Sequence, residues 1–192
     1  IPVGLASSFL RIPLLLLEQN SIPGRSNRFL SGFARHIFCG YSETLNYFPP
    51  DRSSYSGNPV PLIPSSSSAP DTILVSGGSQ GARHINTLFQ KLLPELSSYP
   101  LKILWCTGPL HFKEIIDSLQ NYQQSSTCFI MNKLQLYIHS FLSPLTDYLA
   151  DIKFALCRSG AMTVAELCAA RIPAVYIPYP HATDRHQHHN VD

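Results

Sequence analysis

The chain is organised around residues 72–83, which read Thr72-Ile73-Leu74-Val75-Ser76-Gly77-Gly78-Ser79-Gln80-Gly81-Ala82-Arg83. The apolar run 73–75 predicts a buried parallel strand, which the glycines then end. From residue 82 onward apolar side chains recur at helical spacing and predict a helix, at Ile85, Leu88, Phe89, Leu92, Leu93 and Leu96. A strand, a glycine turn and a helix in this order let backbone N–H groups approach an anion at the positive end of the helix.

A second turn of the same kind follows the apolar run 154–157. It reads Arg158-Ser159-Gly160-Ala161 and leads into a predicted helix over residues 162–170. A single glycine-rich turn also occurs where nothing binds, and the first turn is neither a Walker loop nor a regular Gly-x-Gly-x-x-Gly. Two such turns in one α/β unit favour a ligand that carries both phosphate and sugar, and Ser79 and Gln80 add side-chain donors at the first turn.

The composition narrows the class of protein. The 192 residues are 44% hydrophobic and 14% charged, which suits a globular α/β core. The formal net charge of +2 is too small to indicate a nucleic-acid partner. The five cysteines include no Cys-x-x-Cys pair, which predicts reduced, buried thiols in a cytosolic protein and neither a disulfide framework nor a zinc site. No apolar run reaches the ~18 residues of a membrane-spanning helix.

Alternating strands and helices predict an α/β fold with parallel sheets and helical crossovers. Residues 51–70 are rich in Pro and Ser, so we expect a flexible connector and a domain boundary near Pro61; a long surface loop inside one domain is the alternative. Besides the elements around the two turns, we expect strands at 12–17, 37–40, 102–106, 128–132 and 174–177, helices at 4–10, 27–33, 111–120 and 145–150, and a brief return of the chain at 42–45.

Several polar side chains stand where ligands commonly bind. Asn20 lies at the carboxyl end of the predicted strand 12–17, the place where open α/β sheets bind ligands. Glu166 lies two turns into the helix after the second turn, where its carboxylate could accept both hydroxyls of a ribose or could simply be solvated. His186 and His189 have the spacing of metal ligands, but no matching Cys or Glu accompanies them, so we expect no metal there. The alternative is a polar helix start, with Gln187 facing a sugar.

Together these segments resemble the MurG family, the bacterial N-acetylglucosaminyltransferases of peptidoglycan synthesis (glycosyltransferase family 28). The matching motifs occur in the family's order over nearly the whole chain, at Glu18-Gln19-Asn20, Pro23-Gly24, Gly57-Asn58-Pro59-Val60, Gly77 to Arg83, Cys157 to Ala161 with Glu166, and Asp184 to Gln187 with Asn190. The resemblance implies a GT-B fold of two Rossmann-like parallel-sheet domains, the first only partly present. Residues 1–61 would belong to the acceptor and membrane domain, and residues 62–192 to the UDP-GlcNAc-binding domain.

The resemblance also implies an activity. It is the inverting transfer of GlcNAc from UDP-GlcNAc to undecaprenyl-diphospho-MurNAc-pentapeptide (lipid I), which forms lipid II in cell-wall synthesis, with no cofactor and no required metal. The enzyme would act as a peripheral protein at the cytoplasmic face of the inner membrane, with other cell-wall synthesis proteins as further candidate partners. A non-catalytic nucleotide-sugar-binding module and another GT-B glycosyltransferase are the alternatives.

Residue roles follow from the resemblance. Ser79 would meet the donor diphosphate, in the turn formed by Gly77, Gly78 and Gly81. The Leu142 backbone would read uracil, Arg158 would lie near the nucleotide, and Glu166 would accept the ribose hydroxyls. His186 and Gln187 would hold GlcNAc, and Asn20 would face the acceptor.

Two departures from the family pattern matter. Pro61 stands where the family often has Arg, which puts one donor contact in question. The family's first glycine-rich loop, which would supply the general base, would precede Ile1, and the closing C-terminal helices are absent too. We therefore expect a fragment that is inactive, or nearly so, by itself.

Overall fold

The computed structural model describes residues 1–64, 69–180 and 186–191, and at His186 the backbone alone. The chain forms two compact units. Unit 1 comprises Ile1–Val60, Ser159–Ala165 and Pro178–Asp192, and unit 2 comprises Pro61–Arg158 and Glu166–Ile177. The acceptor and donor roles expected for residues 1–61 and 62–192 remain predictions.

Unit 1 is built on a small parallel sheet in the order β1-β2-β3. Each of the first two strands buries alternate residues, because strand side chains point to opposite faces in turn. The buried side chains form a core with α2 and the following turn, centred on Ile37 and Cys39. The elements of this unit are α1 (Pro2–Phe9), β1 (Leu15–Glu18), α2 (Arg25–Leu30), β2 (His36–Cys39), η1 (Glu43–Tyr47), β3 (Ser53–Tyr55) and α7 (His186–His189).

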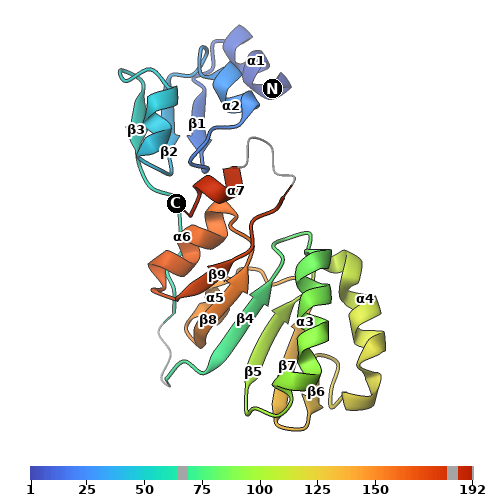
Figure 1. The fold of residues 1–192 in the computed structure, drawn as a ribbon. Coiled ribbons are helices and arrows are strands. Elements are labelled where there is room, and N and C mark those ends of the chain that lie inside the picture. The colour runs from blue at the N-terminus through green and yellow to red at the C-terminus, as the bar shows by residue number, and fades with distance from the viewer. Residues whose placement is uncertain (65–68, 181–185, 192) are drawn as a thin grey trace. The chain divides into compact units, whose positions relative to one another are not determined.

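Unit 2 carries a six-stranded sheet in the order β6-β7-β5-β4-β8-β9 (Figure 1). All neighbours pair in parallel except β6 with β7. Its elements are β4 (Thr72–Ser76), α3 (Arg83–Leu96), β5 (Lys102–Cys106), α4 (Pro109–Ser118), η2 (Gln120–Tyr122), β6 (Cys128–Met131), β7 (Leu134–His139), α5 (Thr146–Leu149), β8 (Ile152–Cys157) and β9 (Ala174–Tyr176). Helix α6 (Ala161–Ala169) starts in unit 1 and ends in unit 2.

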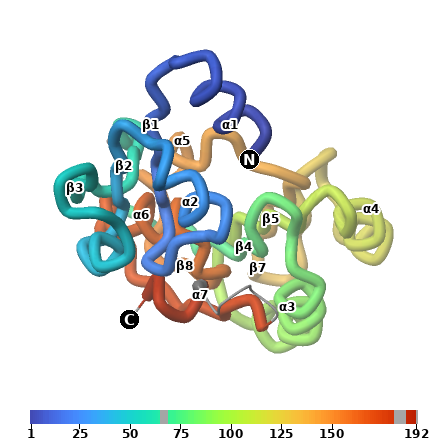
Figure 2. Tube along the Cα trace, turned by 90° about the horizontal axis from the view of Figure 1, so that it is seen from above, coloured from blue at the N-terminus to red at the C-terminus, as the bar shows by residue number. Residues whose placement is uncertain are grey.

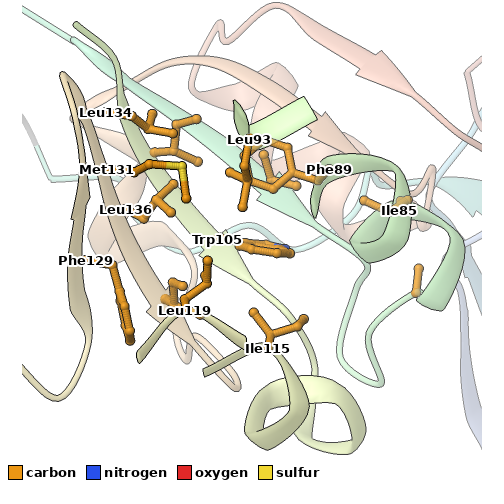
Figure 3. Packing of buried hydrophobic residues seen from close by; sticks show 14 residues of the cluster. Ile85, Phe89, Leu93, Trp105, Ile115, Leu119, Phe129, Met131, Leu134 and Leu136 are labelled. Carbon is orange, nitrogen blue, oxygen red and sulfur yellow. The ribbon is translucent and has the colours of Figure 1, made fainter. Parts of the chain in front are cut away.

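Helices cover both faces of this sheet. Helices α3 and α4 lie together on one side of β4 and β5 (Figure 2), and their apolar side chains meet the sheet around Trp105. Phe89 of α3 packs edge-on against Trp105, with ring centroids 4.7 Å apart (Figure 3). On the other face Leu149 and Leu167 pack against Leu74. Burial on both faces explains why the central strands read as continuous apolar runs.

The structure corrects four expectations. Residues 42–45 do not return as a strand but begin η1, and β3 lies inside the segment that we expected to be an irregular connector. The second sheet is mixed, because β6 turns back antiparallel to β7, a strand that the sequence analysis missed. Not all the thiols are buried, since Cys168 is exposed and Cys128 is half-buried. Strand β4, before the first turn, and strand β5, after α3, lie where they were expected.

Candidate functional site

The first glycine turn follows β4 and is held by short-range hydrogen bonds to its own backbone and to Ser76. Gly78 and Gly81 have φ of 81° and 77°, a region that residues with a side chain rarely adopt. The Gly81 N–H donates to the Gly78 carbonyl at 3.0 Å, and the Gly78 N–H donates to Ser76 Oγ at 3.2 Å. Ser79 and Gln80 are exposed between these glycines. The turn therefore presents two polar side chains to solvent on a backbone that glycine makes possible.

Gly81 also allows a close approach to the next turn of the sheet. A Cβ on Gly81 would lie 2.8 Å from Cα of Gly108 and closer still to the Thr107 carbonyl oxygen. Buried Asn86 of α3 donates from Nδ2 to that carbonyl at 2.8 Å and accepts from Trp105 Nε1 at 3.1 Å. Asn86, which no sequence pattern singled out, fixes the start of α3 to the end of β5.

Helix α3 begins without a side-chain cap. Its N-cap residue, Ala82, is extended and offers no oxygen to the first turn. The first N–H groups of a helix have no partner within the helix, and the helix dipole makes that end positive. The N-terminal end of α3 can therefore hold an anion beside Ser79.

The second turn leaves the sheet beside the first. Cys157 and Ser76 are partners in the parallel β8–β4 register, so both turns start at the carboxyl edge of neighbouring strands. The Arg158 N–H donates to the Ser76 carbonyl at 3.3 Å, and its Nη1 donates to the Ile177 carbonyl at 2.8 Å. Arg158 is only 7% exposed, so part of its guanidinium serves the protein's own backbone.

Glu166 and Leu142 also belong to unit 2. Glu166 is half-buried in α6, and this burial raises the pKa of its carboxyl group. No described residue donates a hydrogen bond to its carboxylate, so its oxygens can accept hydrogen bonds from a ligand. Leu142 is buried in the core between β7 and α5. Its predicted role, binding uracil, uses only the backbone of Leu142, so the burial of the side chain does not prevent it.

In unit 1 the structure shows what Glu18 does, a residue that the sequence placed in a motif without a role of its own. Glu18 is 3% exposed, and its carboxylate accepts four hydrogen bonds. Oε1 accepts the N–H and Nδ2 of Asn20 at 3.0 and 3.2 Å, and Oε2 accepts the Gly24 N–H at 3.0 Å and Asn27 Nδ2 at 2.9 Å. A buried carboxylate needs such donors. Glu18 therefore shapes the loop that carries Asn20, beside a pocket of about 440 Å³.

Asn20 meets a residue 170 positions away in the chain. Asn190, 3% exposed, donates from Nδ2 to Asn20 Oδ1 at 3.3 Å and to the Ser159 carbonyl at 3.1 Å, and accepts from the Ser21 N–H at 3.0 Å. Its carbonyl accepts from the Tyr41 hydroxyl. Ser159 is fully buried, and its Oγ has no partner among the described residues. The sequence placed Asn190 in a motif but could not show that it joins these segments.

Helix α7 carries the two predicted sugar-binding residues. Gln187 is half-buried, and its Oε1 accepts the Tyr179 N–H at 2.8 Å. The amide oxygen is therefore engaged, and the amide nitrogen is the group that could donate to a sugar hydroxyl. The side chain of His186 lies outside the described residues. Asn20, His186 and Gln187 belong to unit 1, whereas the other predicted site residues belong to unit 2.

The described part of the chain shows neither a metal centre nor a membrane span. Among residues 1–64, 69–180 and 187–191 there is no group of three or more His, Cys, Asp or Glu side chains that could hold a metal ion. No described helix is long and apolar enough to cross a membrane.

Curated proteins match nearly the whole chain by sequence. A curated protein of Coxiella burnetii is 38% identical over 99% of this chain, and one of Lactococcus lactis subsp. cremoris is 32% identical over 99%. Both are named UDP-N-acetylglucosamine–N-acetylmuramyl-(pentapeptide) pyrophosphoryl-undecaprenol N-acetylglucosamine transferase. The chain spans 53% of each, or about half the length of these relatives.

Solved structures agree on the fold. Acinetobacter baumannii MurG superposes with a TM-score of 0.66 at 30% identity, over 99% of this chain and 53% of that one. A calicheamicin glycosyltransferase superposes with a TM-score of 0.60 at 14% identity, over 97% of this chain and 54% of that one, which shows the fold alone. Residues 72–192 match the C-terminal domain of glycosyltransferase family 28. This match begins at β4 and covers more than half of the chain, so the chain belongs to glycosyltransferase family 28.

Proposed function

We propose that this protein is an inverting N-acetylglucosaminyltransferase that moves GlcNAc from UDP-GlcNAc to undecaprenyl-diphospho-MurNAc-pentapeptide. The carrying observation is the match at 30–38% identity over 99% of the chain to relatives that are named for this reaction. The glycine turn at the uncapped start of α3 supports it, because such a turn suits a diphosphate.

The donor roles follow the chemistry of the individual groups. Ser79 and the first N–H groups of α3 bind the diphosphate, and Arg158 lies near the nucleotide. Glu166 accepts the two ribose hydroxyls, and the backbone at Leu142 binds the uracil edge. On α7, His186 and the amide nitrogen of Gln187 hold the GlcNAc hydroxyls. Binding neutral hydroxyls through a carboxylate and an amide needs no metal.

The acceptor role falls to the loop after β1. Asn20, which the Glu18 network positions, faces the acceptor. Because the acceptor carries a polyprenyl chain, the protein works at the cytoplasmic face of the membrane as a peripheral enzyme. Other cell-wall synthesis proteins are its natural partners there.

Isothermal titration calorimetry tests the donor site directly. The chain is titrated with UDP-GlcNAc, UDP-glucose and UDP, and we expect UDP-GlcNAc to bind most tightly. Glu166→Ala should weaken all three ligands by a similar factor, about tenfold or more, because a charged acceptor for two hydroxyls contributes about 1.5–3 kcal/mol. The matched control is Glu114→Ala, which removes an exposed carboxylate on α4 and should leave binding unchanged.

Turnover separates an enzyme from a binding module. Release of UDP in the presence of UDP-GlcNAc and the lipid acceptor supports the transferase, whether it comes from this chain or from a longer form of it. Donor binding without any turnover in the longer form would support a non-catalytic module. Equal affinity for UDP-glucose and UDP-GlcNAc would point to a different donor sugar.

A further inference from the structure

A second pocket of unit 1 adjoins the loop that carries Asn20. Its volume is about 540 Å³, which is within the range of small-molecule sites. Ser21 and Asn190 are its most buried lining residues, at 8% and 3% exposed. Asn190 accepts from the Ser21 N–H and donates to Asn20 Oδ1 at 3.3 Å. Ile22 lines both this pocket and the pocket of about 440 Å³ beside Asn20, so the loop separates two neighbouring cavities.

The short helix η1 supplies much of the wall. Glu43, Asn46 and Tyr47 line the pocket from this element. Thr44, which lies between them in the chain, is fully buried, and its Oγ1 donates to the Ser21 carbonyl at 2.9 Å. A buried hydroxyl group that is bonded in this way holds η1 against the loop after β1. The wall is therefore fixed in place by the fold itself.

The wall combines apolar surface with hydrogen-bonding groups. Tyr47, 46% exposed, and half-buried Ile22 supply the apolar surface. The Arg28 guanidinium lies over the Tyr47 ring, 4.8 Å from its centroid, and steadies that ring. The side chains of Glu43 and Asn46 are exposed, and no described residue bonds to either, so both are available to a ligand. Tyrosine for contact area and short amides for adaptable hydrogen bonding are typical of surfaces that bind polypeptides.

The charge of the lining helps to decide which part of the proposed acceptor suits this pocket. Glu43 contributes a carboxylate, and the described lining contains no lysine or arginine. A carboxylate repels a diphosphate. The sugar offers hydroxyl groups but little apolar surface. The peptide offers N–H groups to Glu43, both N–H and carbonyl groups to Asn46, and apolar side chains to Tyr47, so it matches every exposed group of the wall.

We propose that this pocket binds the peptide portion of the acceptor. The inference rests on the proposed function and deepens it, because it places one part of that substrate beside Asn20. Tyr47 packs against peptide side chains, and Glu43 and Asn46 bond the peptide backbone.

Three soluble probes separate the parts of the acceptor. The chain is titrated with N-acetylmuramyl-pentapeptide, N-acetylmuramic acid and inorganic pyrophosphate, while the backbone amide signals of Asn46 and Tyr47 are followed by NMR. The muramyl-pentapeptide should shift both signals and bind at least about tenfold more tightly than N-acetylmuramic acid, because the peptide adds the contacts with Tyr47, Glu43 and Asn46. Pyrophosphate should shift neither signal.

Two substitutions in η1 test the wall. Tyr47→Ala removes the ring and should weaken the muramyl-pentapeptide about fivefold, measured at Asn46. Asn46→Ala removes one hydrogen-bonding group and should weaken it about two- to fivefold, measured at Tyr47. The control is Tyr55→Ala, which removes a tyrosine of β3 that is 60% exposed and does not line the pocket. Thermal unfolding checks that the variants fold, and if Tyr47→Ala does not, the result for Asn46→Ala decides.

Four results would overturn the proposal. They are no shift of either signal with the muramyl-pentapeptide, equal binding of that probe and N-acetylmuramic acid, a shift with pyrophosphate, and unchanged peptide binding in the folded variants. The proposed function fails separately, when UDP-GlcNAc does not bind in the calorimetry. UDP-GlcNAc binding without a peptide effect overturns this inference alone, whereas a peptide effect without UDP-GlcNAc binding overturns the transferase and leaves a peptide-binding pocket.

Discussion

The two turns that leave β4 and β8 have the same outline and different construction. The first depends on glycine: Gly78 and Gly81 have positive φ, and Gly81 sits against Thr107 and Gly108. Its polar side chains, Ser79 and Gln80, are exposed. The second depends on hydrogen bonds from Arg158 to Ser76 and Ile177, and Arg158 is buried.

This difference separates a turn whose side chains can bind a ligand from a turn whose side chain stabilises the fold. A turn shaped mainly by glycine leaves its exposed side chains available to a ligand, whereas a turn held by a buried side chain has already committed that side chain. We therefore expect substitutions at the first turn to divide cleanly into structural and binding effects. At the second turn, a substitution of Arg158 should change both the stability of the fold and the binding of the ligand. The four substitutions below test that division, from the largest expected effect to the smallest.

Gly81→Ala should be the most damaging change. The new methyl group would meet the Thr107 carbonyl and Gly108, and the positive φ adds backbone strain. Overpacking of this kind with a left-handed backbone costs about 3–5 kcal/mol. Urea unfolding followed by the fluorescence of Trp105, the single tryptophan, measures it in unit 2. Gly78→Ala is the control. Its φ is also positive, at 81°, but beyond its chain neighbours no atom lies within 4 Å of the new Cβ, so we expect a loss of about 1–2 kcal/mol of unfolding free energy. Equal losses of unfolding free energy in the two variants would mean that the close packing at Gly81 does not contribute to stability.

Arg158→Leu should come next. The Ile177 carbonyl loses a charged donor, which costs about 1–3 kcal/mol of unfolding free energy. The same urea titration measures this loss, and Arg83→Leu, which removes an exposed arginine from α3, should change stability little. UDP affinity is measured on the folded variant. Lost affinity without lost stability would show that Arg158 serves the ligand alone and contradict the supporting role.

Glu166→Gln should change the pH dependence of stability. Burial raises the pKa of Glu166 in the folded chain, so the folded state holds this proton more tightly than the unfolded state. The contribution of Glu166 is therefore fully present below its unfolded pKa and is lost as pH rises through the folded pKa. Glutamine cannot ionise, so the variant should be slightly more stable than the parent at neutral pH while binding UDP-GlcNAc more weakly. Thermal midpoints measured between about pH 4 and pH 7 test this, with Glu114→Gln as the control. A variant that is less stable than the parent at neutral pH would contradict it.

Ser79→Ala should have the smallest effect. The side chain is exposed, so stability should not change measurably. Loss of one hydrogen bond from an uncharged, solvent-exposed hydroxyl group should weaken UDP binding about two- to fivefold. Calorimetry measures this, with Ser98→Ala, an exposed serine after α3, as the control. Unchanged affinity would remove Ser79 from the diphosphate site and leave the backbone of the turn as its only binding group.

Local patterns predicted the elements around β4 well. The strand, the glycine turn and the helix over residues 72–96 follow from an apolar run, residues without side chains and a helical period, and all three act within a few positions. Strand β7 was not predicted, although its buried residues Leu134, Leu136 and Ile138 alternate with a period of two. Strand β3 has no apolar period and exists through its pairing with β2.

The sequence by itself determined where the chain extends, turns and coils, because backbone preference and side-chain periodicity are properties of neighbours. It also determined the family, through motifs that keep their order. Only the tertiary structure decided which polar groups are already engaged. Asn190 reaches Ser21 across 169 positions, Arg158 bonds the Ile177 carbonyl, and the Glu18 carboxylate gathers four donors. A polar group finds its partner by distance in space, and that distance exists only once the chain has folded.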